Sequence, residues 1–69
     1  MIWGKIEAIM KKDPARDYFA GDLAEEIFGM ENRRRYVGRV GACLRTAEKY
    51  GLVKCTGTRD GARVWRWVA

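Results

Sequence analysis

The chain has 69 residues, a net charge of +5 and 48% hydrophobic residues. This length provides one domain with one small core, and the mixture of apolar and oppositely charged residues excludes a disordered chain. With no histidine and only two cysteines, the chain lacks the ligands for a four-ligand zinc site and the commonest general base. We therefore expect a single domain spanning residues 1–69 that is not an enzyme, with no catalytic residue, no metal and no cofactor.

The N-terminal segment carries charged residues within its apolar pattern. Lys5 and Glu7 interrupt it, so it does not resemble a signal peptide, and no apolar run approaches the roughly 18 residues of a membrane span. Cys43 and Cys55 both lie in apolar surroundings, where free buried thiols are the expected state. These features favour a cytoplasmic protein that does not bind a membrane.

Apolar residues at helical spacing predict a first helix over the opening residues, ending near Asp13-Pro14 because proline disfavours helix at the residue before it. Tyr18-Phe19 predicts a short stub of strand. A second helix is expected to follow, with acidic residues in its first turns and Gly29 as its stop. Its apolar stripe consists of Leu23, Ala24, Ile27 and Phe28.

A third helix is predicted from Asn32, as N-cap, to Tyr50, with Gly51 ending it. At 100° per residue, one face is apolar and is expected to face the core: Tyr36, Val37, Val40, Leu44 and Ala47. The opposite face combines basic with small residues: Arg34, Gly38, Ala42, Arg45 and Lys49, flanked by Arg35, Arg39 and Thr46. Small residues on this face allow close approach to a surface while long arginines reach sideways.

A β-hairpin is predicted after the third helix, and its register has two candidates. A two-residue Asp60-Gly61 loop pairs residues whose numbers sum to 121, whereas a three-residue loop that includes Arg59 gives a sum of 120. The second register places apolar residues opposite each other, with Val53 facing Trp67 and Cys55 facing Trp65. Because a slip of one residue moves every side chain to the other face, we expect the second register, with both tryptophans packed under the sheet.

Basic residues are concentrated in the C-terminal half. Residues 31–69 contain ten basic and three acidic side chains, whereas residues 1–30 contain four basic and six acidic ones. Such an asymmetry indicates a face that binds a polyanion. The alternative is a solvated helix face, but such a face normally mixes charges of both signs, and only Glu31 and Glu48 oppose this one.

The order of helix, short strand, helix, helix and hairpin resembles the winged helix-turn-helix DNA-binding superfamily over nearly the whole chain. The residues that carry the resemblance are Asp22-Leu23-Ala24-Glu25-Glu26-Ile27 for the second helix, Leu44, Ala47, Gly51, Leu52 and Val53 for the entry to the wing, and Arg59-Asp60-Gly61 for its tip. The resemblance implies an α+β fold, a small winged helix-turn-helix with three helices plus a C-terminal β-hairpin wing. It identifies no subfamily.

In that superfamily the third helix enters the major groove of DNA and the wing touches a flanking groove or the backbone. The resemblance therefore implies a DNA-binding protein, a small transcriptional regulator or DNA-binding module whose partner is double-stranded DNA, and which is nucleoid-associated if its source is prokaryotic. The implied DNA-binding residues are Arg34, Arg35, Arg39, Ala42, Arg45 and Lys49 on the helix, and Arg59 and Arg63 on the wing.

Several alternatives remain open at this stage. The chain is also compatible with a protein–protein interaction module of a larger complex, and Trp3 suggests a homodimer contact. Arg33 either binds phosphate at the start of the third helix or pairs with Glu25 or Glu26. RNA or single-strand binding would require exposed aromatic residues. No pocket for a small-molecule ligand is evident from the sequence.

Overall fold

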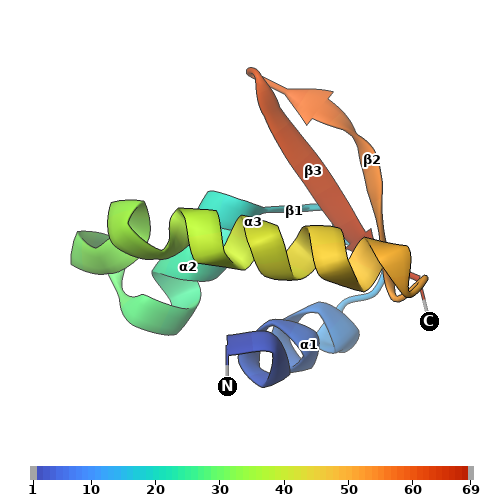
Figure 1. The fold of residues 1–69 in the computed structure, drawn as a ribbon, viewed down its shortest axis with the longest axis horizontal. Coiled ribbons are helices and arrows are strands. Elements are labelled where there is room, and N and C mark those ends of the chain that lie inside the picture. Colours follow the sequence, from blue (N-terminus) through green and yellow to red (C-terminus); the bar gives the residue numbers. More distant parts are fainter. Residues whose placement is uncertain (1, 69) are drawn as a thin grey trace.

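Three α-helices and a three-stranded antiparallel sheet make up residues 2–68, the part of the chain that the computed structural model describes (Figure 1). In chain order the elements are α1 (Ile2–Lys12), β1 (Tyr18–Phe19), α2 (Ala20–Phe28), the 3₁₀ turn η1 (Met30–Asn32), α3 (Arg33–Lys49), β2 (Val53–Arg59) and β3 (Ala62–Trp67). The predicted α+β class is confirmed. Across these residues, no helix has the length and apolar character needed to cross a membrane.

The core lies between the three helices and the lower part of the sheet. The buried residues of this cluster are Ile6, Met10, Tyr18, Leu23, Ala24, Val40, Leu44, Ala47, Val53, Trp65 and Trp67. Trp65 is only 3% exposed, and Trp67 stacks on Trp3 of α1 with ring centroids 6.3 Å apart. The prediction that both C-terminal tryptophans pack under the sheet is confirmed.

The strand stub and the helix ends agree with the sequence in most respects. β1 pairs with the middle of β3, Tyr18 opposite Trp65 and Phe19 opposite Val64. α1 ends one residue before Asp13. α2 ends at Phe28, and Gly29, the predicted stop, follows it with a positive φ of 92° that favours glycine. α2 begins at Ala20, however, three residues before the start of its predicted apolar stripe.

Asn32 occupies the position before α3, but the prediction that its side chain caps this helix is wrong. Its backbone is already near-helical, with φ −103° and ψ 0°, because it belongs to η1. A capping side chain normally requires an extended backbone at that position. Asn32 Nδ2 instead donates a 3.0 Å hydrogen bond to the carbonyl of Phe28 and so satisfies the end of α2.

The hairpin contains both of the registers considered for it. At its base Val53 pairs with Trp67 and Cys55 with Trp65, as predicted. At its tip Arg59 pairs with Ala62, so the loop is the two-residue Asp60-Gly61 and the predicted three-residue loop is wrong. A bulge between Cys55 and Gly57 reconciles the two registers. Asp60 and Gly61 have φ of 53° and 80°, as a type I′ turn requires at both positions.

Candidate functional site

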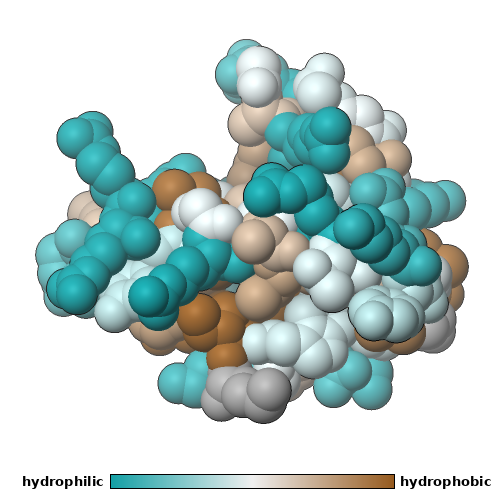
Figure 2. Space-filling model, viewed as in Figure 1, coloured by the Kyte–Doolittle hydropathy of each residue, from teal (hydrophilic) through white to brown (hydrophobic). Residues whose placement is uncertain are grey.

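The outer face of α3 carries the basic residues predicted from the helical wheel. All eight residues assigned to this face or to its flanks are exposed: Arg34, Arg35, Gly38, Arg39, Ala42, Arg45, Thr46 and Lys49. Figure 2 shows hydrophilic side chains projecting at intervals across the side of the molecule that carries α3, with smaller and less polar residues between them. The opposite face of the helix is anchored in the core by Val40, Leu44 and Ala47.

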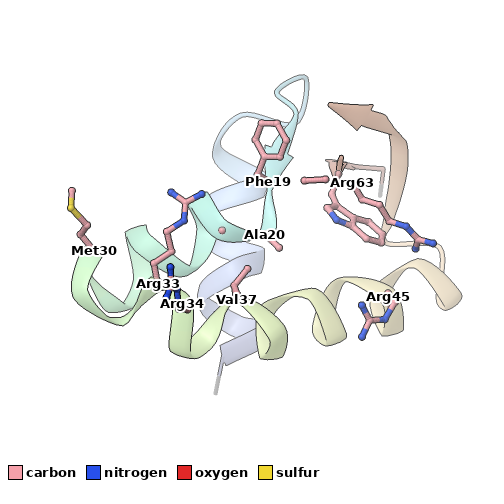
Figure 3. A pocket seen from close by; sticks show the side chains of 11 residues that line it. Phe19, Ala20, Met30, Arg33, Arg34, Val37, Arg45 and Arg63 are labelled. Atoms are coloured by element: carbon pink, nitrogen blue, oxygen red, sulfur yellow. The ribbon is translucent and has the colours of Figure 1, made fainter. Parts of the chain in front are cut away.

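A cleft of about 700 Å³ separates α3 from the hairpin. Its lining consists of Phe19, Ala20, Gly21, Met30, Arg33, Arg34, Val37, Arg45, Ala62, Arg63 and Trp65. Figure 3 shows Arg34, Val37 and Arg45 extending from α3 on one side of the cleft, with Phe19 and Arg63 on the sheet side. The cleft thus has an apolar floor and guanidinium groups on both walls.

Arg33 also lines the cleft, but its guanidinium group is paired with carboxylates. Its Nη1 lies 3.4 Å from Asp22 Oδ1 and 3.7 Å from Glu25 Oε1, both on α2, and its side chain points toward α2 in Figure 3. A Cβ atom at Gly21 would lie 2.6 Å from Arg33 Nη2, so the glycine leaves room for this arrangement. Of the two readings left open for Arg33, the structure favours pairing, with Asp22 as a partner that the sequence did not suggest.

Arg35 and Arg39, which do not line the cleft, lie beside an aromatic stack formed by Tyr36 and Phe28. Tyr36 stacks on Phe28 with ring centroids 4.0 Å apart. The guanidinium carbons of Arg35 and Arg39 lie 5.5 Å and 5.8 Å from the centroid of the Tyr36 ring. Within this range a cation is attracted to the face of the ring, so these two side chains are oriented by Tyr36.

The two arginines predicted at the hairpin tip lie in different surroundings. Arg63 lines the cleft. Arg59 instead pairs with Asp17, its Nη2 lying 3.4 Å from Asp17 Oδ2, and both residues line a separate hollow that does not include Arg63. The structure therefore brings Arg63 together with Arg34 and Arg45 and places Arg59 apart from them.

The remaining basic residues of the site have no carboxylate partner among residues 2–68. No described carboxylate lies within ion-pairing distance of Arg34, Arg35, Arg39, Arg45, Lys49 or Arg63. Their charge is therefore not neutralised locally and adds to a positive potential along α3 and into the cleft.

An apolar groove on the far side of α3 was not predicted from the sequence. It encloses about 420 Å³ and is lined by Trp3, Ala42, Cys43, Thr46, Ala47, Tyr50 and Leu52. Tyr50 is 77% exposed beside it. The sequence signal for this groove was Trp3, which was proposed as a homodimer contact and is half-buried in the structure. Ala42 and Thr46 belong both to the groove and to the outer face of α3.

Asp17 is the second feature that sequence reasoning missed. Its carboxylate accepts hydrogen bonds from three side chains of the hairpin, those of Thr56, Arg59 and Arg66. The hydrogen bond from Arg66, together with the nearby positive charges, lowers the pKa of Asp17 from its ordinary value of 3.8. Comparison with known proteins adds no relative to this description, since no family model, curated protein or solved structure matches the chain.

Proposed function

We propose that this chain is a winged helix-turn-helix domain that binds double-stranded DNA, with α3 in the major groove and the β2–β3 hairpin as the wing. The observation that carries the proposal is the cleft between these elements, because Arg34, Arg45 and Arg63 line it without any carboxylate partner in the described chain. Uncompensated arginines on two facing walls suit a strand of phosphates, which they neutralise with release of counterions.

The arrangement of the elements supports the proposal. The hairpin rises from near the C-terminal end of α3, α1 lies on the opposite side of α3 from the hairpin, and α2 lies behind the N-terminal half of α3 (Figure 1). The two-residue β1 joins the sheet beside β3, giving the strand order β1-β3-β2. This order and the short first strand agree with the wing architecture that the sequence resemblance implies.

The dimensions of α3 are compatible with a duplex. Arg34 and Arg45 are eleven residues apart, or about 16 Å along the helix axis. Gly38 and Ala42 lie exposed between the arginines, and their small size lets the helix approach a surface closely. The major groove, about 12 Å wide, admits a helix. Arg39 and Arg45 are then the side chains expected to reach base edges, while Arg34, Arg35, Lys49 and Arg63 bind phosphates.

The test is fluorescence anisotropy of random-sequence duplex DNA across a salt series. The test variant is Arg34→Ala/Arg45→Ala/Arg63→Ala, and the charge-matched control is Lys5→Ala/Lys12→Ala/Arg16→Ala, whose residues do not line the cleft. We expect binding with a linear log–log salt dependence. The slope should be lower by about 2 in the cleft variant, since Arg34 and Arg63 are its two phosphate contacts and each contributes roughly 0.9. Equal losses in both variants, or no binding by the wild type at low salt, would refute the proposal.

A second candidate function is a protein-interaction module, which the apolar groove beside Tyr50 favours. In this case the chain would retain a protein partner after nuclease treatment, and Tyr50→Glu would release it while leaving the cleft intact. Sedimentation velocity over a concentration series checks the homodimer, with Trp3→Ala as the variant expected to dissociate it. A wild type that stays monomeric and a partner that survives Tyr50→Glu would exclude a role for this groove.

A further inference from the structure

Asp17 connects both strands of the hairpin to the body of the domain. The residue directly precedes β1, and its side chain is 15% exposed. Oδ1 accepts a 2.8 Å hydrogen bond from Arg66 Nε and a 3.3 Å hydrogen bond from Thr56 Oγ1, and Oδ2 accepts a 3.4 Å bond from Arg59 Nη2. Arg66 lies on β3, whereas Thr56 and Arg59 lie on β2, so one carboxylate holds both strands.

These contacts span the bulge at which the hairpin changes register. Thr56 lies between Cys55 and Gly57, where the ladder is interrupted. Gly57 has a φ of 149°, a conformation that favours glycine and lets the strand bend. Arg66 pairs with Lys54 on the base side of the bulge, and Arg59 lies on the tip side. Asp17 therefore bonds to the hairpin on both sides of its bend.

Apart from the ladder between its own two strands, the tip has few contacts in the described chain that fix its orientation. Residues 57–63 are all exposed, so burial contributes little to holding them in place. β1 pairs with β3 only at Val64 and Trp65, below the tip. Within residues 2–68, the Arg59–Asp17 pair is the side-chain interaction that ties residues 58–63 to another element. The direction of the tip, and with it the position of Arg63 over the cleft, depends on the bend and on this pair.

We infer that Asp17 is a positioning residue of the DNA interface: through Arg66, Thr56 and Arg59 it sets the bend of the hairpin that places Arg63 opposite α3. This inference rests on the proposed function for its DNA part. It assigns a negative residue a favourable role in binding a polyanion. Charge alone has the opposite effect, because removal of an acid from a DNA-binding protein strengthens its attraction to phosphates.

The first arm of the test uses no DNA and stands whether or not the chain binds it. In Asp17→Asn the side-chain carbonyl can still accept a hydrogen bond from Arg66 or Thr56. The amide NH₂ group then faces Arg59, and the contact is lost because both groups are donors. The charge-matched control is Asp60→Asn, since asparagine tolerates the positive φ of the turn. The heteronuclear ¹H–¹⁵N NOE of the amides of residues 58–62 is expected to fall in Asp17→Asn and to stay at the wild-type level in Asp60→Asn and Asp17→Glu. An unchanged NOE in Asp17→Asn would overturn the inference.

The second arm measures DNA affinity in a double-mutant cycle. We expect Asp17→Asn to bind duplex DNA more weakly than the wild type. The loss of affinity caused by Arg63→Ala should be about threefold or more smaller in the Asp17→Asn protein than in the wild type, which is at the low end of coupling within one network. The loss caused by Arg34→Ala should stay the same in both backgrounds. Tighter binding by Asp17→Asn, or no coupling to Arg63, would overturn the inference.

A third variant keeps the test decisive if Asp17→Asn does not fold, as judged by far-UV circular dichroism. Arg59→Ala removes only the pair on the tip side and changes an exposed residue. Its amide NOE at residues 58–62 is expected to fall as in Asp17→Asn, and a wild-type value would overturn the inference. A wild type that shows a rigid tip but binds no DNA would refute the proposed function and leave the structural role of Asp17 in place.

Discussion

The rings of Phe28 and Tyr36 are stacked, with centroids 4.0 Å apart and planes 16° from parallel. This stack joins the last residue of α2 to the first turns of α3 across the η1 turn. Arg35 and Arg39 lie against the same tyrosine ring. One aromatic contact thus supports both the turn between two helices and the orientation of two predicted DNA contacts.

The first prediction concerns this stack. Tyr36→Leu should lower the free energy of unfolding by about 1 kcal/mol, the scale of an aromatic pair, and should weaken DNA binding because Arg35 and Arg39 lose the ring that orients them. Tyr36→Phe keeps the ring and should behave as the wild type in both measurements, made by urea denaturation and by anisotropy. Equal loss of affinity in the two variants would contradict an orienting role for the ring.

The second prediction separates Arg33 from its neighbour. Because Arg33 pairs with Asp22 and Glu25 at a partly exposed site, Arg33→Ala should lower stability by less than about 1 kcal/mol and should leave the salt slope of DNA binding almost unchanged. Arg34→Ala should leave stability unchanged and reduce the slope by about 1. A reduction of the slope by Arg33→Ala as large as that by Arg34→Ala would show that Arg33 also binds phosphate.

The third prediction tests whether α3 enters a groove. Ala42 is exposed midway along the basic face, and Ala42→Leu adds bulk there without changing charge or helix propensity greatly. We expect it to weaken duplex binding at least about tenfold, roughly 1.4 kcal/mol. Ala8→Leu makes the same change at an exposed position of α1 and should have no effect. Wild-type affinity in Ala42→Leu would place the duplex away from the centre of α3.

The fourth prediction concerns pH. The pKa of Asp17 is lowered in the folded state, chiefly by the hydrogen bond from Arg66, so the folded protein resists protonation of this group more than the unfolded chain does. The stabilisation is therefore fully present above the ordinary pKa of 3.8 and is lost as the pH falls through the lower folded value. Thermal melting from pH 6 to pH 2, in steps of about one unit, should show a smaller acid-induced decrease in Asp17→Asn than in the wild type. Parallel curves would contradict this assignment.

Much of the fold follows from local pattern. The helical stripes predict all three helices, and alternation of apolar residues around Val53 and Trp67 predicts the base of the hairpin, because burial of one face specifies a strand register strongly. At the exposed tip no burial specifies the register. At the tip the register is set by the preference of Asp60-Gly61 for a two-residue turn. The register set by burial at the base and the register set by the turn differ by one residue, and the bulge accommodates this difference.

The positions of the charged residues of the site could be predicted from the sequence, but the ion pairs they form could not. The basic face of α3 follows from the helical wheel, but the sequence does not indicate which arginines are neutralised. Asp17 is 49 residues away from Arg66 in the chain, and no local rule connects positions so far apart. The division of the arginines between the cleft and the Tyr36 side likewise depends on where the hairpin stands relative to α3, which is a property of the packed structure.

The bulge also divides the hairpin into a part that the core depends on and a part that it does not. Below Gly57, Val53, Trp65 and Trp67 are buried, so substitutions there act on folding. Above it every residue to Arg63 is exposed. Apart from Arg59, which pairs with Asp17, evolution or a protein engineer can therefore change the residues of the tip, and with them what the tip contacts, without disturbing the buried core.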